Sequence, residues 1–592
     1  MRSIFPGNLI PTSHLDPVSL NILTFYPLPN RTPTDAFTNA NNYIGNVTNK
    51  RSMQQYVIRV DHHLSDVDSL FMRYFYFHHF DDNGAQSPWP NPVVRDRNDN
   101  FETQNSVVSE THVFSPSVVN EVLIGAARQH FPFQVYSYGG NWPQKLGLPA
   151  SVPPTAFPNV NNGLAGFPTQ TVGLRGALTW QFTDHITLVY GSHNIIVGSE
   201  YRLLFGNNYQ TVSPSGTYNF AQALTGNPQM QTGTGSSFAT FMLGYVSSAS
   251  VTTHVGESEK GYAFAGFIQD DWRVTRNLTF NLGLRYDYQT PPYERNNGLS
   301  NFFPSLIDPV NGLRGAVVYE GKGFQGGAFD ADYTNFGPRF GFAYDVGGRG
   351  KTVMRGGYSI YYPDIFNVLY FGNTSGFSTT TTTYNPPGNN TNFPAFIFHN
   401  GLPSPPVQPL GSALGPAAFL GQAVSIDQRN QRTPMSQQWD FSIQRQLPRQ
   451  WVVDVSYAGN HGTHLVSGGY DLNQLTPQQY QTLGTALQST VPNPYVGIVP
   501  GALGAATITL QQFLATFPYY TSVTVRNPHM GNSIYHAGLL RVEKRFSEGL
   551  TFLASYTKAT LIDDSVASPI AFGRRRAGKC SFLPKRPLQS SS

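Results

Sequence analysis

Residues Tyr262 to Tyr288, YAFAGFIQDDWRVTRNLTFNLGLRYDY, show the pattern that most of this chain repeats. In the second half of the stretch, apolar side chains occupy every other position and polar or small residues lie between them. The apolar positions are Leu278, Phe280, Leu282, Leu284, Tyr286 and Tyr288, and the others are Asn277, Thr279, Asn281, Gly283, Arg285 and Asp287. A period of two places successive side chains on opposite faces of a β-strand, whereas a helix would scatter them around its axis.

The first half of the stretch alternates more loosely. Tyr262, Phe264, Ile268 and Trp272 share one parity, and the polar triplet at residues 275–277 separates the two halves. Two strands joined by a short polar turn form an antiparallel hairpin. The sequence therefore predicts a hairpin here, and the same unit can be sought along the rest of the chain.

Six further hairpins have the same signature. They are predicted at Gln55–Leu64 with Ser69–His78, at 105–128 turning at 115–117, at Leu178–Val189 with Asn194–Leu204, at Asn335–Val346 with Thr352–Tyr362, at Gln437–Leu447 with Trp451–Ala458, and at Ser533–Phe546 with Leu550–Ala559. Between hairpins lie connections of roughly 20 to 70 residues, rich in Gly, Pro and Asn and expected to lack regular structure. Residues 237–245 fit either a short helix or a strand, and Asp16 with Pro17 predicts a short helix that begins there.

The composition is unusual for a water-soluble chain of this size. Only 12% of the 592 residues are charged, about half the usual share of roughly 25%. Aromatic residues reach 14%. This suits a protein whose outside is not wholly in water, or a secreted β-protein rich in loops.

Charge and cysteine content exclude several function classes. The net charge is +4 and no basic cluster is extensive, so we expect no nucleic-acid partner. The one cysteine, Cys580, permits neither a disulfide framework nor a cysteine metal site within the chain. No apolar run approaches the ~20 residues of a membrane-spanning helix, so a membrane protein must cross with strands.

The order of the connections predicts an all-β fold, an antiparallel transmembrane β-barrel. Such barrels have short periplasmic turns, longer extracellular loops and strands of about ten residues. We expect roughly 14 to 16 strands, and loops 129–171, 363–433 and 459–531 are expected to form the external ligand-contact surface. The N-terminal residues contain no apolar signal-peptide core, and residues 563–592, with Arg574–Arg576 and Cys580, show no strand pattern. A truncated or frameshifted barrel is therefore expected.

Six segments resemble, in order, the barrel of TonB-dependent receptors, especially the Oar-like group common in acidobacteria. They are FPGNLIPTSHLDPVS with YPLPN, RVDHHLSDVDSLFMRYFY, FIQDDWRVTRNLTFNLGLRYDY, NFGPRFGFAYDV with VMRGGYSIYY, PMSQQWDFSIQRQL with VVDVSYAGNHGTHL, and NSIYHAGLLRVEKRFSEGLTFLASYT. The resemblance implies a 22-stranded outer-membrane barrel, preceded by a signal peptide and a plug, that takes up scarce large ligands using the TonB system.

On this resemblance the chain is expected to be a fragment of such a receptor. Residues 1–50 would join plug and barrel, residues 51–562 would form a partial barrel of 14–16 of the 22 strands, and residues 563–592 would be an atypical, frameshifted tail. The expected partners are outer-membrane lipid, the TonB system of the intact family, whose contact segment is absent from this sequence, and an unidentified extracellular ligand. Ligand-contact residues are not assigned.

Three motifs invite a catalytic or binding role, and each has a plainer interpretation. Residues 347–352, GGRGKT, imitate the end of a phosphate-binding loop, but a strand follows where that motif needs a helix. The histidines at 62, 63, 78, 79, 461 and 464 have no acidic or cysteine partner at ligand spacing, and adjacent strand residues point apart. Asp270 and Asp271 diverge for the same reason. We therefore expect no enzyme, no cofactor and no metal site.

Aromatic residues near strand ends, Tyr286, Tyr288, Tyr361 and Tyr362, are expected to form membrane-interface belts, with cross-strand packing as the alternative. Two other classes of function remain open. One is a plugless pore or surface adhesin on the same barrel. The other is a soluble secreted β-protein, such as a propeller, although the unequal spacing of the turns argues against regular repeats.

Overall fold

The computed structural model describes residues 5–35, 39–230, 233–366, 372–547 and 549–565. Within them, one antiparallel sheet contains fourteen long strands that pair in chain order, with the short strand β13 added beside β11. The long strands are β1 (Arg51–His63), β2 (Asp68–Asp81), β3 (Arg97–Ser115), β4 (Val118–Val135), β6 (Thr171–Tyr190), β7 (His193–Val212), β11 (Glu257–Arg273), β12 (Leu278–Gln289), β16 (Phe336–Asp345), β17 (Thr352–Tyr361), β21 (Met435–Leu447), β22 (Trp451–Val466), β27 (His529–Ser547) and β28 (Leu550–Asp563).

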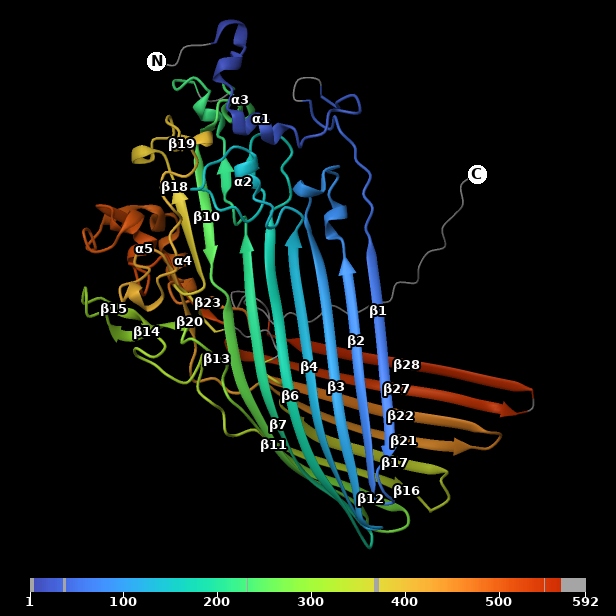
Figure 1. The fold of residues 1–592 in the computed structure, drawn as a ribbon. Helices are drawn as coiled ribbons and strands as arrows, with labels where there is room; N and C mark the ends of the chain where they lie inside the picture. Colours follow the sequence, from blue (N-terminus) through green and yellow to red (C-terminus); the bar gives the residue numbers. More distant parts are fainter. Residues whose placement is uncertain (1–4, 36–38, 231–232, 367–371, 548, 566–592) are drawn as a thin grey trace.

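The sheet curls into an incomplete barrel wall, and its first and last strands cross at a large angle (Figure 1). Each strand pairs with its neighbour in sequence, and β1 and β28 are the two edges of the described sheet. All seven predicted hairpins are confirmed, as is the number of strands. Most strands are longer than predicted because they continue past the alternating stretch toward the long connections.

Several tight turns are closed by a hydroxyl side chain. Ser65 Oγ accepts hydrogen bonds from the amides of Val67 and Asp68 at 3.1 and 3.0 Å. Thr275 Oγ1 accepts from Asn277 and Leu278 at 3.2 and 3.1 Å in the turn of the β11–β12 hairpin. The backbone amides of a turn have no partner in the ladder of the sheet, and a nearby hydroxyl group can accept their hydrogen bonds. This explains why the strands end at these polar turn residues.

The long connections are folded, and together they form what we call the cap, at the end of the strands away from the tight turns (Figure 1). The cap comprises the described residues of 5–35, 82–96, 136–170, 213–256, 290–335, 362–434 and 467–528. One of its strands, β13, also pairs with β11 of the main sheet. The strands of the cap are β5 (Asn159–Asn161), β8 (Thr217–Asn219), β9 (Tyr245–Val246), β10 (Ser248–His254), β13 (Tyr293–Glu294), β14 (Ser300–Ile307), β15 (Arg314–Tyr319), β18 (Thr379–Tyr384), β19 (Phe396–Ile397), β20 (Ala423–Asp427), β23 (Tyr470–Asp471), β24 (Thr490–Pro492), β25 (Thr507–Thr509) and β26 (Ser522–Arg526).

Short helices complete the cap. The α-helices are α1 (Pro17–Leu23), α2 (Trp142–Lys145), α3 (Ser237–Met242), α4 (Pro477–Leu483) and α5 (Leu510–Phe513). The 3-10 turns are Pro6–Asn8, Thr12–His14, Asn83–Gln86, Pro92–Val94, Gln222–Leu224, Pro387–Asn389, Phe398–Asn400, Gly411–Leu414, Gly484–Gln488 and Gly501–Gly504. The predicted helix at Asp16 is confirmed, and Ser237–Met242 resolves the helix-or-strand alternative as a helix. In the described part of the chain, no helix has the length and apolar character that a membrane crossing requires.

The two largest apolar cores of the described residues lie in the cap and hold it together. The expectation that the connections lack regular structure is therefore wrong. The first core joins α1 to distant segments through Val18, Ile22, Tyr218, Phe241 and Phe398, all fully buried. Each large apolar side chain buried in this way contributes roughly 1.5–3 kcal/mol. Residues 16–26 therefore fold as part of the cap.

The second core lies beside β14 and β15. Phe302 meets Phe517 edge-on at 5.4 Å and Tyr520 at 5.2 Å between ring centroids. Val317 and Val523 close the same cluster. Aromatic pairs in this geometry add about 0.5–1.5 kcal/mol beyond their area burial, so segments some 200 residues apart in the chain form one unit.

Candidate functional site

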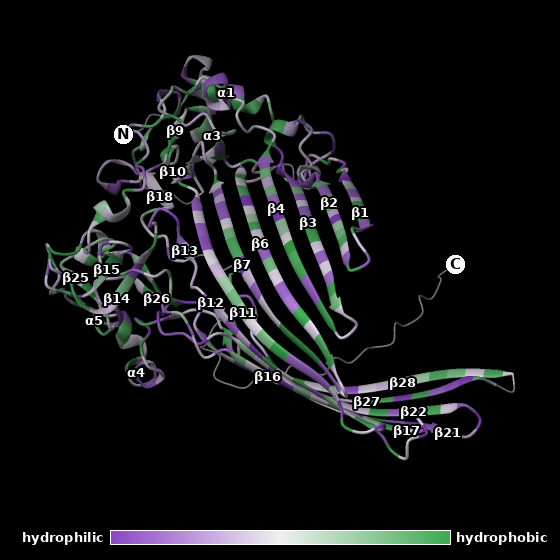
Figure 2. Cartoon of the chain, turned by 60° about the horizontal axis from the view of Figure 1, so that its bottom comes forward, coloured by the Kyte–Doolittle hydropathy of each residue, from purple (hydrophilic) through white to green (hydrophobic). Residues whose placement is uncertain are grey.

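The main sheet has one apolar and one polar face, as alternation predicts. Leu282 and Leu284 on β12 and Ile268 opposite Leu284 on β11 are 38, 45 and 50% exposed. Hydrophilic and hydrophobic residues alternate along the strands in Figure 2. We call this apolar face the outer face. The outward apolar band and polar interior are the arrangement of a membrane barrel, in which the exposed row meets lipid.

The opposite parity forms the inner face, which carries a network of charges. Arg202 on β7 pairs with Glu200 at 2.8 Å and with Asp364 at 2.7 Å. Arg285 on β12 pairs with Asp287 at 2.9 Å and lies 3.8 Å from Glu200. These side chains are mostly buried, so each ion pair is screened less than one at the surface.

The network fastens a segment of the cap to the wall. Asp364 belongs to the connection after β17, and its neighbours bond to Gln289 at the end of β12. The Gln289 amide donates to the Pro363 carbonyl at 2.9 Å, and its oxygen accepts from the Ile365 amide at 2.9 Å. Residues 363–366 therefore fold over the inner face instead of leaving the wall.

A hollow of about 200 Å³ opens beside this network. It is lined by Phe267, Gln269, Gly283, Arg285 and Arg339, together with Ile268 and Leu284. Glycine at 283 leaves the space between the neighbouring side chains open, and the Arg339 guanidinium lies 4.9 Å from the centre of the Tyr361 ring. The inner face thus offers charged and aromatic groups to whatever occupies the interior.

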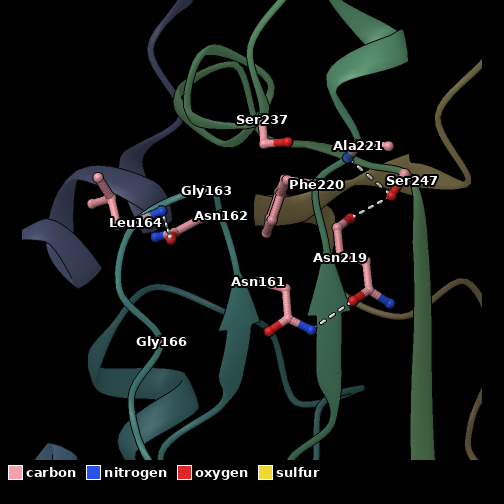
Figure 3. A pocket seen from close by; sticks show the side chains of 10 residues that line it. All are labelled: Asn161, Asn162, Gly163, Leu164, Gly166, Asn219, Phe220, Ala221, Ser237 and Ser247. Carbon is pink, nitrogen blue, oxygen red and sulfur yellow. Dashed lines mark hydrogen bonds between the residues drawn. The ribbon is translucent and has the colours of Figure 1, made fainter. Parts of the chain in front are cut away.

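A larger pocket, of about 360 Å³, lies within the cap (Figure 3). Three segments line it: the end of β5 with the following loop, the end of β8, and the start of α3 with the residue before β10. The lining residues are Asn161, Asn162, Gly163, Leu164, Gly166, Asn219, Phe220, Ala221, Ser237 and Ser247. None of them is charged. We call it the cap pocket.

Among the titratable groups of the cap with shifted pKa values are a carboxyl and a histidine. Burial raises the pKa of the Glu320 carboxyl above its ordinary value. Burial lowers the pKa of His254 on β10, while the nearby Glu257 acts in the opposite direction. Desolvation disfavours the charged form in both cases, so the cap favours neutral side chains at these positions.

The motifs predicted to be structural have the geometry of structural elements. Residues 347–352 belong to the connection from β16 to β17, and the Gly350 amide donates to Asp345 Oδ2 at 2.8 Å. Thr352 begins a strand, which confirms the hairpin. Asp270 accepts a bond from His193 at 2.7 Å on the outer face, and Asp271 accepts from Asn281 at 2.6 Å on the inner face. The two carboxylates therefore diverge as predicted.

The histidine pairs are also split between the faces. His62 lies opposite Leu70 on the outer face, and His63 lies opposite Ser69 on the inner face. The structure gathers a different set, Asp68, Glu110 and His112, whose ligand atoms lie within 4.8 Å of one another on the outer face. Sequence reasoning missed this cluster because its members come from two strands. Asp68 is already bonded to Ser65 and His112, at 2.6 and 2.5 Å.

The aromatic residues expected in an interface belt lie on different faces. Tyr286 packs on Phe336 at 4.8 Å, and Tyr288 stacks on Tyr333 at 5.2 Å, both from the outer parity of β12. Tyr361 lies on the inner face with Arg339, so its expected place in a lipid-facing belt is wrong. The reason is alternation, because Tyr361 and Tyr362 cannot both face outward.

A curled antiparallel wall with an apolar outside, a polar inside and tight turns at one end defines an outer-membrane β-barrel. The family comparison agrees. The model of the outer membrane beta barrel domain matches residues 2–578, and the chain belongs to this family. It is accordingly a protein of the bacterial outer membrane. No curated protein matches the sequence.

Solved structures with a similar fold include outer-membrane transporters and receptors. The outer membrane transporter YddB of Escherichia coli is 10% identical, with a TM-score of 0.47 over 88% of this chain and 50% of that one. The copper transporter OprC is 9% identical, with a TM-score of 0.43 over 87% and 54%. The ferripyoverdine receptor of Pseudomonas aeruginosa is 11% identical, with a TM-score of 0.39 over 87% and 50%. The chain spans about half the length of these structures.

Proposed function

We propose that this protein is the barrel portion of a TonB-dependent receptor of the Oar-like type, which takes up a ligand across the outer membrane. The observation that carries the proposal is the combination of a polar inner face with a folded cap at one end of the wall. Six sequence segments in family order support the same class. The proposed role is uptake and not catalysis.

The division of the chain follows from this role. Residues 51–562 would form the partial barrel, that is, the wall together with the cap connections between its strands. Residues 1–50 would join the plug to this barrel, and residues 563–592 would be an atypical tail of different composition. Residues beyond 565 lie outside the described part of the chain. The cap, with its segments from 129–171, 363–433 and 459–531, would face the exterior and meet the ligand first, while the TonB system would supply energy from the other side.

A pore or adhesin on the same wall is the second candidate, because a polar inner face would equally line a passive channel. Deletion of the gene in the source bacterium distinguishes them. For a receptor, growth on limiting nutrients should fail in the deletion strain and equally in a strain that lacks a working TonB system. Uptake that depends on the gene and persists without TonB would identify a pore, and unchanged uptake with loss of surface attachment would identify an adhesin.

A further inference from the structure

The cap pocket is made entirely of neutral groups, which limits what it can bind. A charged ligand entering a partly enclosed site loses hydration, and no opposite charge among the lining residues would compensate for this loss. An anionic or cationic ligand is therefore disfavoured. The volume of the pocket, about 360 Å³, lies at the lower end of the ~300–1,000 Å³ typical of small-molecule sites.

The rim of the pocket presents side-chain oxygens and hydroxyls in a fixed arrangement (Figure 3). Asn161 Nδ2 donates to Asn219 Oδ1 at 2.7 Å, which fixes the orientation of both amides and directs their remaining groups. Asn219 Nδ2 donates in turn to Ser248 Oγ at 3.1 Å. Among the described residues, the Ser237 hydroxyl and Asn161 Oδ1 have no hydrogen-bond partner, so both remain available to a ligand.

The backbone and one wall complete the site. Gly163, at φ +83°, allows the loop to turn close to Ser237, and a Cβ there would lie 3.0 Å from the Ser237 Cβ. Leu164 is 39% exposed and offers an aliphatic surface, while Phe220 is 3% exposed and also lines the pocket. The pocket thus combines oriented amides and a hydroxyl with one apolar side.

We propose that the cap pocket binds a neutral polyhydroxylated ligand, such as one sugar unit of a neutral oligosaccharide. Hydroxyl groups both donate and accept, which matches an amide oxygen beside a serine hydroxyl, and the C–H face of a sugar ring would pack on Leu164. An extended peptide fits less well, because the adjacent edge strand β5 spans only Asn159–Asn161. If the proposed uptake is correct, this site selects the ligand class. Binding itself does not depend on transport.

Isothermal titration of the full chain tests the proposal. The detergent must be lauryldimethylamine oxide, because glucoside and maltoside detergents carry sugar headgroups. The probes are maltotriose, cellotriose, xylotriose and chitotriose as neutral sugars, trigalacturonic acid as an anion and trialanine as a peptide. At least one neutral trisaccharide should bind. Absence of binding by all four, or preferential binding of trigalacturonic acid or trialanine, overturns the proposal.

Variants locate the binding. Asn161→Ala removes one oriented amide and should raise Kd about tenfold, the effect of losing roughly one hydrogen bond. Ser237→Leu fills the pocket and should abolish binding. Gln481→Ala, at an exposed amide on α4 outside the pocket, should leave Kd unchanged. Heat-modifiable gel mobility identifies variants that still fold, and unchanged affinity in both folded pocket variants overturns the assignment. Because the readout is binding, failure here is separable from failure of TonB-dependent uptake.

Discussion

At the scale of single residues, Asp16 joins the N-terminal segment to the cap. Its side chain is almost wholly buried, and it accepts from the amides of Val18 and Ser19 at 2.9 and 3.0 Å, which begins α1. Its other oxygen accepts from His399 Nδ1 at 2.7 Å. We predict that Asp16→Ala destabilises the cap by about 2–3 kcal/mol, from the lost helix cap and a strong hydrogen bond, as measured by near-UV circular dichroism during thermal unfolding.

The control is Asp16→Asn, which keeps an oxygen that can cap the helix. This variant should destabilise the cap less than Asp16→Ala does. Gly244→Ala should resemble Asp16→Ala, because a Cβ at residue 244, where φ is +66°, would overlap the Asp16 carboxylate. Equal stability of wild type and Asp16→Ala would show that the apolar core alone holds α1 in place.

His254 should make the stability of the cap depend on pH. Its pKa is lowered by burial, so below the ordinary value of about 6.5 the unfolded chain binds a proton more readily than the folded one. The contribution of neutral His254 to folding stability is complete above its ordinary pKa, and it is lost as pH falls through the lowered pKa of the folded chain. We predict that the melting temperature of the cap decreases on acidification below about pH 6.5, and that His254→Gln weakens this decrease.

Glu320 provides the opposite sign and serves as an internal comparison. Its pKa is raised, so between the ordinary and the raised value the folded chain binds a proton more readily, and stability declines as pH rises through that window. We predict that Glu320→Gln removes this decline, measured by the same thermal scans from pH 4 to 8. A Gln variant with an unchanged pH profile would assign the decline to another group.

At the scale of single elements, the same substitution should destabilise the barrel at one strand position and be tolerated at the next. Leu282 lies on the outer face of β12, and Asn281 lies on the inner face with its amide on Asp271. We predict that Leu282→Arg lowers the free energy of unfolding of the protein in the membrane by about 2–4 kcal/mol. Asn281→Arg should be tolerated because Arg can pair with Asp271. Urea unfolding in phospholipid vesicles measures both. Equal costs would contradict the assignment of the two faces.

The elements also show what a single sequence can predict. Hairpins such as 262–288 follow from alternation and local turn chemistry, which act within a few residues, so all seven were predicted correctly. The cap was missed because its signal is not local. Tyr218 and Phe398 pack at 5.0 Å between ring centroids although they lie far apart in the chain, and no periodicity in either segment indicates this contact. The cap pocket was missed for the same reason, since three separate segments line it.

At the scale of the whole molecule, the wall and the cap place different requirements on the sequence. The wall needs only the right parity at each position, and many sequences satisfy that requirement. The cap needs particular neighbours, such as Asp16 against His399 and Asn161 against Asn219. If the proposed uptake is correct, ligand specificity resides in the cap, and exchanging cap segments between related barrels should transfer ligand choice without changing how the wall inserts.

The edge strands of the wall favour self-association of the chain. Within the described residues, β1 and β28 each have one neighbour in the main sheet, and their side chains are nearly all exposed, with Tyr556 at 65%. Unpaired strand edges are templates for further pairing. We predict that the 592-residue chain, refolded alone in detergent, self-associates through these edges and elutes as mixed oligomers in light-scattering chromatography.

Val57→Lys with Leu553→Lys, which places charges on both edges, should shift the chain toward monomer. Lysine at the inner-face positions Ser359 and Ser442 on central strands should not. A monodisperse monomer of the unaltered chain would contradict the prediction and would mean that the two edges find each other and close.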